Sequence, residues 1–212
     1  MTRFVRCTIA ALMLTAVALA AAGCGSSGSA PEYKGVVRTP PLRAGSLTLP
    51  DVAPAAKGAD APLRAPKGTL RLLYFGYTYC PDVCPTTLSD LKAALAMLTP
   101  EQRRRLGFAM VTVDPQRDTP RQFNRYLSHF FPRWAAFRTT DPARLRQAER
   151  VFGAQSKKGP VDKDGNYDMS HTAWVYAVDD HGASRLQWAF GTEPADIAHD
   201  LRLLLADQSR AT

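Results

Sequence analysis

The 212-residue sequence has few cysteines, moderate glycine and proline, and one apolar run without a charge. Four cysteines are too few for a small protein held together by disulfides. With 14 glycines, 16 prolines and 45% hydrophobic residues, it is neither collagen-like nor wholly disordered. The run has only 17 residues, Cys7–Gly23, which excludes a polytopic membrane protein. We therefore expect one globular domain of ordinary size with appended segments.

Acidic residues are also scarce, with 19 against 27 basic ones and a formal net charge of +8. Such a balance favours nucleic acid or an anionic surface as a partner. The sequence contains no RNA-binding motif and no interleaving of aromatic with basic residues. We therefore predict no nucleic-acid partner and interpret the charge as a solvated surface near anionic lipid.

Residues 1–23 are typical of a secretory signal, because Arg3 and Arg6 precede the uncharged run. Ala21-Ala22-Gly23-Cys24 resembles the bacterial lipoprotein cleavage box, in which the cysteine receives lipid, although Ala21 replaces the usual Leu. We predict that residues 1–23 are removed and that a lipid on Cys24 anchors the chain to the extracytoplasmic face of the cytoplasmic membrane. An uncleaved membrane anchor and ordinary secretion are the alternatives.

The next segment, residues 24–68, has a different composition from the rest of the chain. Of its 45 residues, 25 are Gly, Pro, Ala or Ser, and its only aromatic residue is Tyr33. Such a segment cannot fold alone, so we predict a flexible tether and a loosely attached lead-in, with Leu47–Leu49 as one short strand. The globular domain is expected over residues 69–207, with a C-terminal tail at 208–212.

Strands and helices alternate within the expected domain. Continuous apolar runs predict buried strands at 70–77 and 108–113, and turn residues predict a hairpin from 172–178 to 184–190. An amphipathic helix follows the first strand, and Thr119-Pro120, Asp141-Pro142 and Pro194 each begin another. This order predicts a thioredoxin-like α/β fold with a central mixed β-sheet flanked by helices.

Cys80 and Cys84 lie where the first strand meets its helix. A thiolate there faces the positive end of the helix dipole, which lowers its pKa. Cysteines four apart in a near-helical turn have Cα atoms about 6 Å apart, close enough for a disulfide or for two thiolates on a soft ion such as Cu(I). Their spacing differs from the C-x-x-C of ordinary thioredoxin-like oxidoreductases. Redox and metal chemistry both remain open at this point.

Three ordered blocks resemble the Sco/SenC family of copper chaperones. They are FGYTYCPDVCPTTL at 75–88, VTVDPQRDTP at 111–120 and YDMSHT at 167–172, within a likeness that covers Thr69–Ala206. The sequence departs from the family at Tyr79, where many members have His. Because that His is not one of the family's usual ligands, the departure affects accessory contacts rather than the site.

The resemblance implies copper, as Cu(I) or Cu(II), bound by Cys80, Cys84 and His171. It also implies delivery to the copper-site subunit of cytochrome c oxidase, where a dinuclear centre is assembled. Two thiolates and one imidazole suit trigonal Cu(I). The alternative is a thiol–disulfide oxidoreductase, served by a thioredoxin-like reductant, in which Cys80 attacks the acceptor's disulfide and Cys84 resolves. A peroxide-reducing enzyme is less favoured, because no activating motif accompanies a cysteine.

Other residues have weaker signals. Asp114 follows the second strand and either supports the site through a hydrogen bond or only forms the turn before Pro115. The stretch from Gly153 to Ser170 is long for a connection and leads into His171, so it either moves with metal or partner binding or is an ordinary surface loop. The other histidines are interpreted as non-ligating: His129, His181 and His199.

Overall fold

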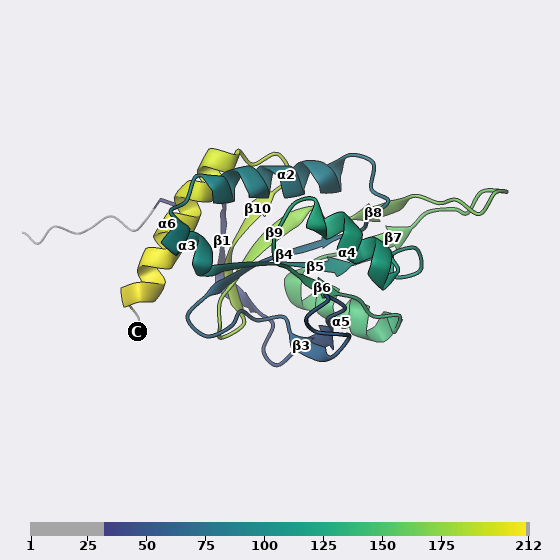
Figure 1. The fold of residues 1–212 in the computed structure, drawn as a ribbon, viewed down its shortest axis with the longest axis horizontal. Helices are drawn as coiled ribbons and strands as arrows, with labels where there is room; N and C mark the ends of the chain where they lie inside the picture. The colour runs from purple at the N-terminus through teal and green to yellow at the C-terminus, as the bar shows by residue number, and fades with distance from the viewer. Residues whose placement is uncertain (1–31, 211–212) are drawn as a thin grey trace, which may run out of the picture. The chain divides into compact units, whose positions relative to one another are not determined.

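A six-stranded mixed sheet organises the fold, with helices on both of its faces (Figure 1). The computed structural model describes residues 32–210. β4, β5 and β6 are parallel, whereas β9, β10 and β1 each pair in the antiparallel sense. In spatial order the strands are β1 (Val36–Arg43), β10 (Ala183–Ala189), β9 (Trp174–Val178), β4 (Leu70–Gly76), β5 (Leu106–Thr112) and β6 (Ala135–Phe137).

The helices begin where the sequence carries capping signals. Thr119 accepts a hydrogen bond from the backbone N–H of Gln122, and Asp141 accepts one from that of Ala143, in each case with proline as the first helical residue. α2 packs beside α6, and Figure 1 shows α2 above the sheet and α5 below it. The helices are α2 (Val83–Ala96), α3 (Pro100–Arg104), α4 (Pro120–Ser128), α5 (Pro142–Phe152) and α6 (Pro194–Arg210).

The two central parallel strands are buried on both faces. Leu72, Leu73 and Tyr74 of β4 are fully buried, as are Ala109 and Met110 of β5. Helices on both sides of the sheet explain why these strands are continuous apolar runs rather than alternating patterns. The mixed sheet with flanking helices confirms the predicted fold class.

The segment before β4 is folded, which corrects the expected tether and lead-in over the described part of residues 24–68. β1 pairs with β10, and two short strands, β2 (Thr48–Pro50) and β3 (Asp60–Pro62), pair with each other. β2 matches the strand expected at Leu47–Leu49 with a shift of one residue. Small apolar residues cannot build a core alone, but here they pack against a sheet formed by the rest of the chain. The buried ones are Ala44, Leu49, Ala53, Leu63 and Ala65.

The other end of the domain also differs from expectation, because α6 runs to Arg210 rather than ending near residue 207. The predicted signal at residues 1–23 and the lipidated Cys24 lie outside the described residues. Between residues 32 and 210, no helix combines the length and apolar character needed to cross a bilayer. The lipid anchor therefore stays a prediction from the sequence.

Asp200 of α6 binds the backbone just before β1. Its fully buried side chain accepts hydrogen bonds from the backbone N–H groups of Lys34 (2.8 Å) and Gly35 (2.7 Å) and from Nε1 of Trp188 (2.8 Å). Because each buried donor left unsatisfied costs about 1–3 kcal/mol, Asp200→Ala is expected to lower the free energy of unfolding by about 2–4 kcal/mol. Urea unfolding of the full chain measures this change. Asp200→Asn keeps one acceptor oxygen and should lose less free energy of unfolding. An unchanged unfolding midpoint in Asp200→Ala would contradict the stabilising role of Asp200.

Candidate metal centre

The carboxyl ends of β4 and β5 position the site. Because these strands are parallel, their ends meet at one edge of the sheet, which places the cysteine loop near the turn that contains Asp114. Gly76, the last residue of β4, allows a close approach. A Cβ there would lie 2.5 Å from Cε1 of Tyr74, 2.9 Å from Cε of Met110 and 3.1 Å from Sγ of Cys84. A larger residue at this position would clash first with Tyr74 and would also crowd Cys84.

Cys80, Cys84 and His171 converge at this edge. One ligand atom from each, two Sγ atoms and a ring nitrogen, lies within 4.8 Å of the other two. Nε2 of His171 is 3.4 Å from Sγ of Cys84, and its Nδ1 is 3.3 Å from the carbonyl oxygen of Thr172. Cys84 is fully buried, whereas Cys80 and His171 are partly exposed. The structure thus brings together all three residues that the sequence identifies as candidate ligands.

The helix start explains the position of Cys80. The backbone N–H of Cys84, in the first turn of α2, donates to Sγ of Cys80 at 3.3 Å. Asp82 occupies the N-cap position, but its side chain makes no capping hydrogen bond. The Cys80 sulfur therefore serves as the acceptor that a capping oxygen usually provides, at the positive end of the helix dipole. This is the orientation predicted for a thiolate at the strand–helix junction.

The pKa values of the two thiols are shifted in opposite directions. The hydrogen bond from the Cys84 thiol lowers the pKa of Cys80. Hydrogen bonds from His171 and the backbone add to this shift, whereas burial opposes it. The same hydrogen bond to Cys80, together with burial, raises the pKa of Cys84. Cys80 is therefore the more acidic thiol of the pair. Metal binding through both sulfurs displaces the proton of the Cys84 thiol.

Two tyrosines enclose the histidine. The rings of Tyr74 and Tyr77 contact His171 edge-on, with centroids 5.9 Å and 5.6 Å away. The Tyr74 hydroxyl donates to Sγ of Cys84 at 3.5 Å, and burial raises the pKa of Tyr74, so it remains a neutral donor. The sequence offered no separate signal for these roles, because both tyrosines lie in a run that reads as buried strand.

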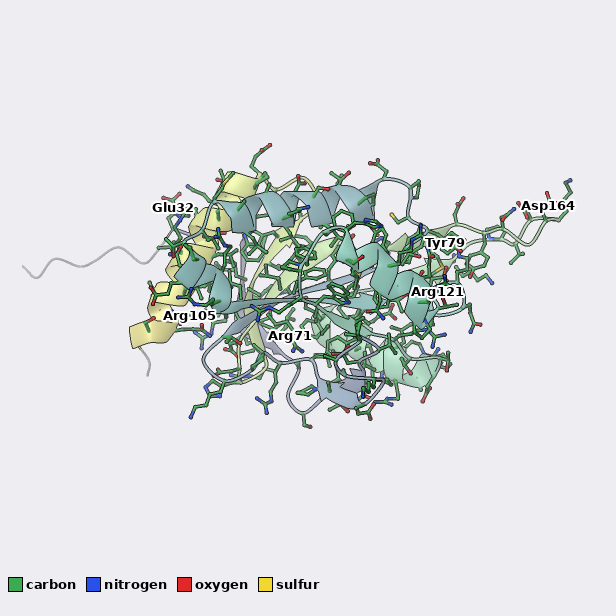
Figure 2. All side chains as sticks on the ribbon, in the orientation of Figure 1. Glu32, Arg71, Tyr79, Arg105, Arg121 and Asp164 are labelled. Carbon is green, nitrogen blue, oxygen red and sulfur yellow. The ribbon has the colours of Figure 1, made fainter. Side chains whose placement is uncertain are left out.

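The stretch expected to be a long loop before His171 forms a hairpin of β7 (Ser156–Lys158) and β8 (Met169–His171). The two strands are antiparallel, with Ser156 opposite His171. Figure 2 shows Asp164 at the far end of this hairpin and Tyr79 nearer the sheet. His171 therefore ends a short strand of its own, three residues before β9 begins. The predicted movement of this segment stays a prediction.

Asp114 and Asp118 are both buried beside the cysteine loop. Asp114 pairs with Arg117 and accepts a hydrogen bond from the Tyr167 hydroxyl at 2.8 Å, so its partner is the hairpin rather than a candidate ligand. Asp118 accepts hydrogen bonds from the hydroxyls of Thr78 (2.6 Å) and Thr112 (2.5 Å), although burial raises its pKa. Asp118 thereby ties the cysteine loop to the end of β5, a role that the sequence reasoning missed.

The remaining histidines lie on other elements. His129 follows the end of α4, His181 occupies the turn between β9 and β10, and His199 belongs to α6. Among residues 32–210, the only cluster of three or more cysteine, histidine or acidic side chains with metal-ligand spacing is the Cys80–Cys84–His171 group. The interpretation of His129, His181 and His199 as non-ligating residues is consistent with this arrangement.

Comparison with known proteins gives consistent matches. Sequence alignment with a "SCO2-like protein" of Rickettsia felis shows 29% identity over 136 residues, 64% of this chain and 66% of that protein. A curated protein of Stutzerimonas stutzeri is 34% identical over 119 residues, 56% of this chain. The chain aligns with only 57% and 66% of the lengths of these two relatives.

Two solved structures share both fold and sequence with this chain. Apo Sco1 of Thermus thermophilus has a TM-score of 0.66 and 30% identity, covering 87% of this chain and all of that one. Bradyrhizobium japonicum ScoI, solved with copper bound, has a TM-score of 0.63 and 32% identity, covering 76% of this chain and 98% of that one. These neighbours show the predicted thioredoxin-like fold. The SCO1/SenC family model matches residues 55–206, so the chain belongs to the SCO1/SenC family.

Proposed function

We propose that this protein is a copper chaperone that binds Cu(I) through Cys80, Cys84 and His171. The observation that carries the proposal is the convergence of two sulfurs and one imidazole nitrogen within 4.8 Å. Two thiolates with an imidazole form a soft donor set that suits Cu(I). The copper-bound relative from Bradyrhizobium japonicum supports the same metal.

The proposed acceptor is the copper-site subunit of cytochrome c oxidase, in which a dinuclear copper centre is assembled. Family membership supports this target, and the partial exposure of Cys80 and His171 supports transfer by ligand exchange with a docked partner. The protein would act on the extracytoplasmic face of the bacterial cytoplasmic membrane, held there by lipid on Cys24. In that oxidising compartment the two thiols need a reductant before they accept copper, and a thioredoxin-like protein would supply it.

One observation favours a second candidate function, reduction of the acceptor's cysteines. The lowered pKa of Cys80 and the raised pKa of Cys84 are typical of an attacking and a resolving thiol. Cys80 would attack one sulfur of the acceptor's disulfide and release the other as a thiolate. Cys84 would then lose its proton and attack the Cys80 sulfur of the mixed disulfide, which releases the acceptor's sulfur as a second thiolate and leaves a Cys80–Cys84 disulfide. This chemistry does not require His171.

The two functions predict different results in cells that lack this protein. We expect cytochrome c oxidase activity to fall severalfold and to be restored by added copper, because excess metal bypasses a chaperone. Oxidase activity measured in isolated membranes tests this expectation. The wild-type gene should restore activity without added copper, whereas a gene encoding His171→Ala should not. Restoration by a membrane-permeant thiol reductant, with no response to copper, would instead establish the reductase.

A further inference from the structure

Arg117 lies among three tyrosines beside the proposed metal centre. Its guanidinium carbon is 3.8 Å from the ring centroid of Tyr167, 5.1 Å from that of Tyr79 and 5.7 Å from that of Tyr77. All three distances are within the range of cation–π attraction. We call Arg117, Asp114 and these three tyrosines the arginine cage.

Hydrogen bonds close the cage in a ring. Nε of Arg117 pairs with one carboxylate oxygen of Asp114, and Nη1 of Arg117 donates to the carbonyl oxygen of Tyr167 at 2.9 Å. The Tyr167 hydroxyl donates to the second oxygen of Asp114 at 2.8 Å. The Asp114 side chain is only 3% exposed and that of Arg117 22%. This ion pair is therefore poorly screened by water, unlike a pair on an open surface.

The arginine cage joins the two parts of the chain that supply the candidate ligands. Tyr77 and Tyr79 belong to the loop that contains Cys80, and Tyr167 lies four residues before His171. The Tyr77 hydroxyl also donates to the carbonyl oxygen of Met169, two residues before His171, at 3.3 Å. Arg117 sits between these parts, on the turn after β5. Arg117 thus contacts both the cysteine loop and the histidine hairpin, in addition to the direct hydrogen bond from Tyr77 to Met169.

The other side of the hairpin base is less firmly packed. A hollow of about 710 Å³ lies there, and its lining includes Arg150, Lys157 and His171. The contact described on that side is the hydrogen bond from Oγ of Ser156 to Oε1 of Glu149, at 2.5 Å. Pairing between β7 and β8 is internal to the hairpin and does not fix it to the sheet. Apart from the contacts of the His171 ring itself with Tyr74, Tyr77 and Cys84, the placement of the hairpin therefore depends on the arginine cage.

We propose that Arg117 is a positioning residue for His171. With Asp114 and Tyr167 it holds the hairpin against the cysteine loop, so that Nε2 of His171 remains within reach of both sulfurs. A lysine could keep the charge opposite Asp114, but it has neither the planar face nor the second directed donor. The inference rests on the proposed function to the extent that His171 is a copper ligand.

The metal-free protein provides the first test. Hydrogen exchange followed by mass spectrometry should show faster exchange over residues 155–172 in Arg117→Met than in the wild type. Arg121→Met, which removes an exposed arginine at the start of α4 (Figure 2), should exchange like the wild type. Arg117→Lys should give an intermediate rate. Unchanged exchange over the hairpin in Arg117→Met would overturn the proposal.

Tyr167→Phe is a milder variant that keeps the proposal testable if Arg117→Met unfolds. This change removes only the hydroxyl that bonds Asp114 and leaves the ring beside Arg117. Its hairpin amides should exchange faster than in the wild type, and amides of the central strands β4 and β5 should remain protected. Equal acceleration in hairpin and central strands, in both Tyr167→Phe and Arg117→Met, would show that the arginine cage supports the whole domain rather than His171.

Copper affinity provides the second test, through a double-mutant cycle. Arg117→Met should weaken Cu(I) binding about 10-fold, in keeping with the roughly 10–100-fold losses seen when residues behind metal ligands are removed. In the His171→Ala background, the same change should have little further effect, because the ligand that it positions is gone. An equal loss in both backgrounds would refute positioning. If His171→Ala itself binds Cu(I) normally, the three-ligand function fails, while the exchange experiment still tests the arginine cage.

Discussion

Replacement of Cys84 by serine is expected to weaken Cu(I) binding at least about 100-fold. Structural zinc sites bind with about 10–16 kcal/mol over four ligands, or roughly 3 kcal/mol for each ligand, and 1.4 kcal/mol is a factor of ten. A hydroxyl does not replace a thiolate on a soft ion, so the estimate is a lower bound. Competition against a Cu(I) chelator, without oxygen and with reduced protein, measures the affinity.

Cys80→Ser is the matched variant for this experiment. It removes the other sulfur from the same group, so its affinity loss should be of similar size. The two variants should differ in acidity, because the thiol that remains in Cys80→Ser is fully buried, and burial raises its pKa even without the hydrogen bond to Cys80. Circular dichroism should show that both retain the fold. Cu(I) affinity within threefold of the wild type in either variant would remove that cysteine from the site.

His171→Ala is expected to weaken Cu(I) binding by a similar factor of about 100, since it also removes one ligand. Its effect on thiol chemistry should be much smaller. Cys80 takes its acidity chiefly from the Cys84 thiol, with His171 a lesser contributor, so the thiolate should persist without the imidazole. The rate of reaction with an aromatic disulfide reagent, followed by absorbance, measures this property.

The combination of results separates the two candidate functions. A chaperone loses copper affinity in all three variants. A reductase loses thiol-exchange activity only in the two cysteine variants. If His171→Ala keeps full copper affinity and still restores oxidase activity in cells, the imidazole has no role in either process. The proposed three-ligand chaperone would then be wrong, and the reductase would account for the paired thiols.

Local signals predicted much of the fold around the site. Proline after Thr119 and Asp141 marked two helix starts, because capping depends on neighbouring residues alone. The continuous apolar run of β4 likewise identified a strand buried on both faces. The cysteine turn could be placed because it directly follows that strand and precedes α2.

Features that depend on distant partners were not predictable in this way. β1 is held by β10, more than a hundred residues later, so its own composition looked like that of a tether. His171 reaches Cys84 only because a hairpin carries it back to the cysteine loop. The role of Arg117 rests on Tyr167, which is 50 residues away, and no pattern near Arg117 indicates that contact.

The depth of Cys84 has a consequence for how copper would be handed over. Cys84 is buried in contact with the Tyr74 hydroxyl and Gly76, whereas Cys80 and His171 are partly exposed to solvent. An incoming ligand would meet the metal from the Cys80 and His171 side, so those two bonds would exchange first and the bond to Cys84 would break last. Just before that last step, copper would be bridged between one buried sulfur and the acceptor. An acceptor therefore needs its own ligands on a protruding loop, because a recessed site could not reach that far.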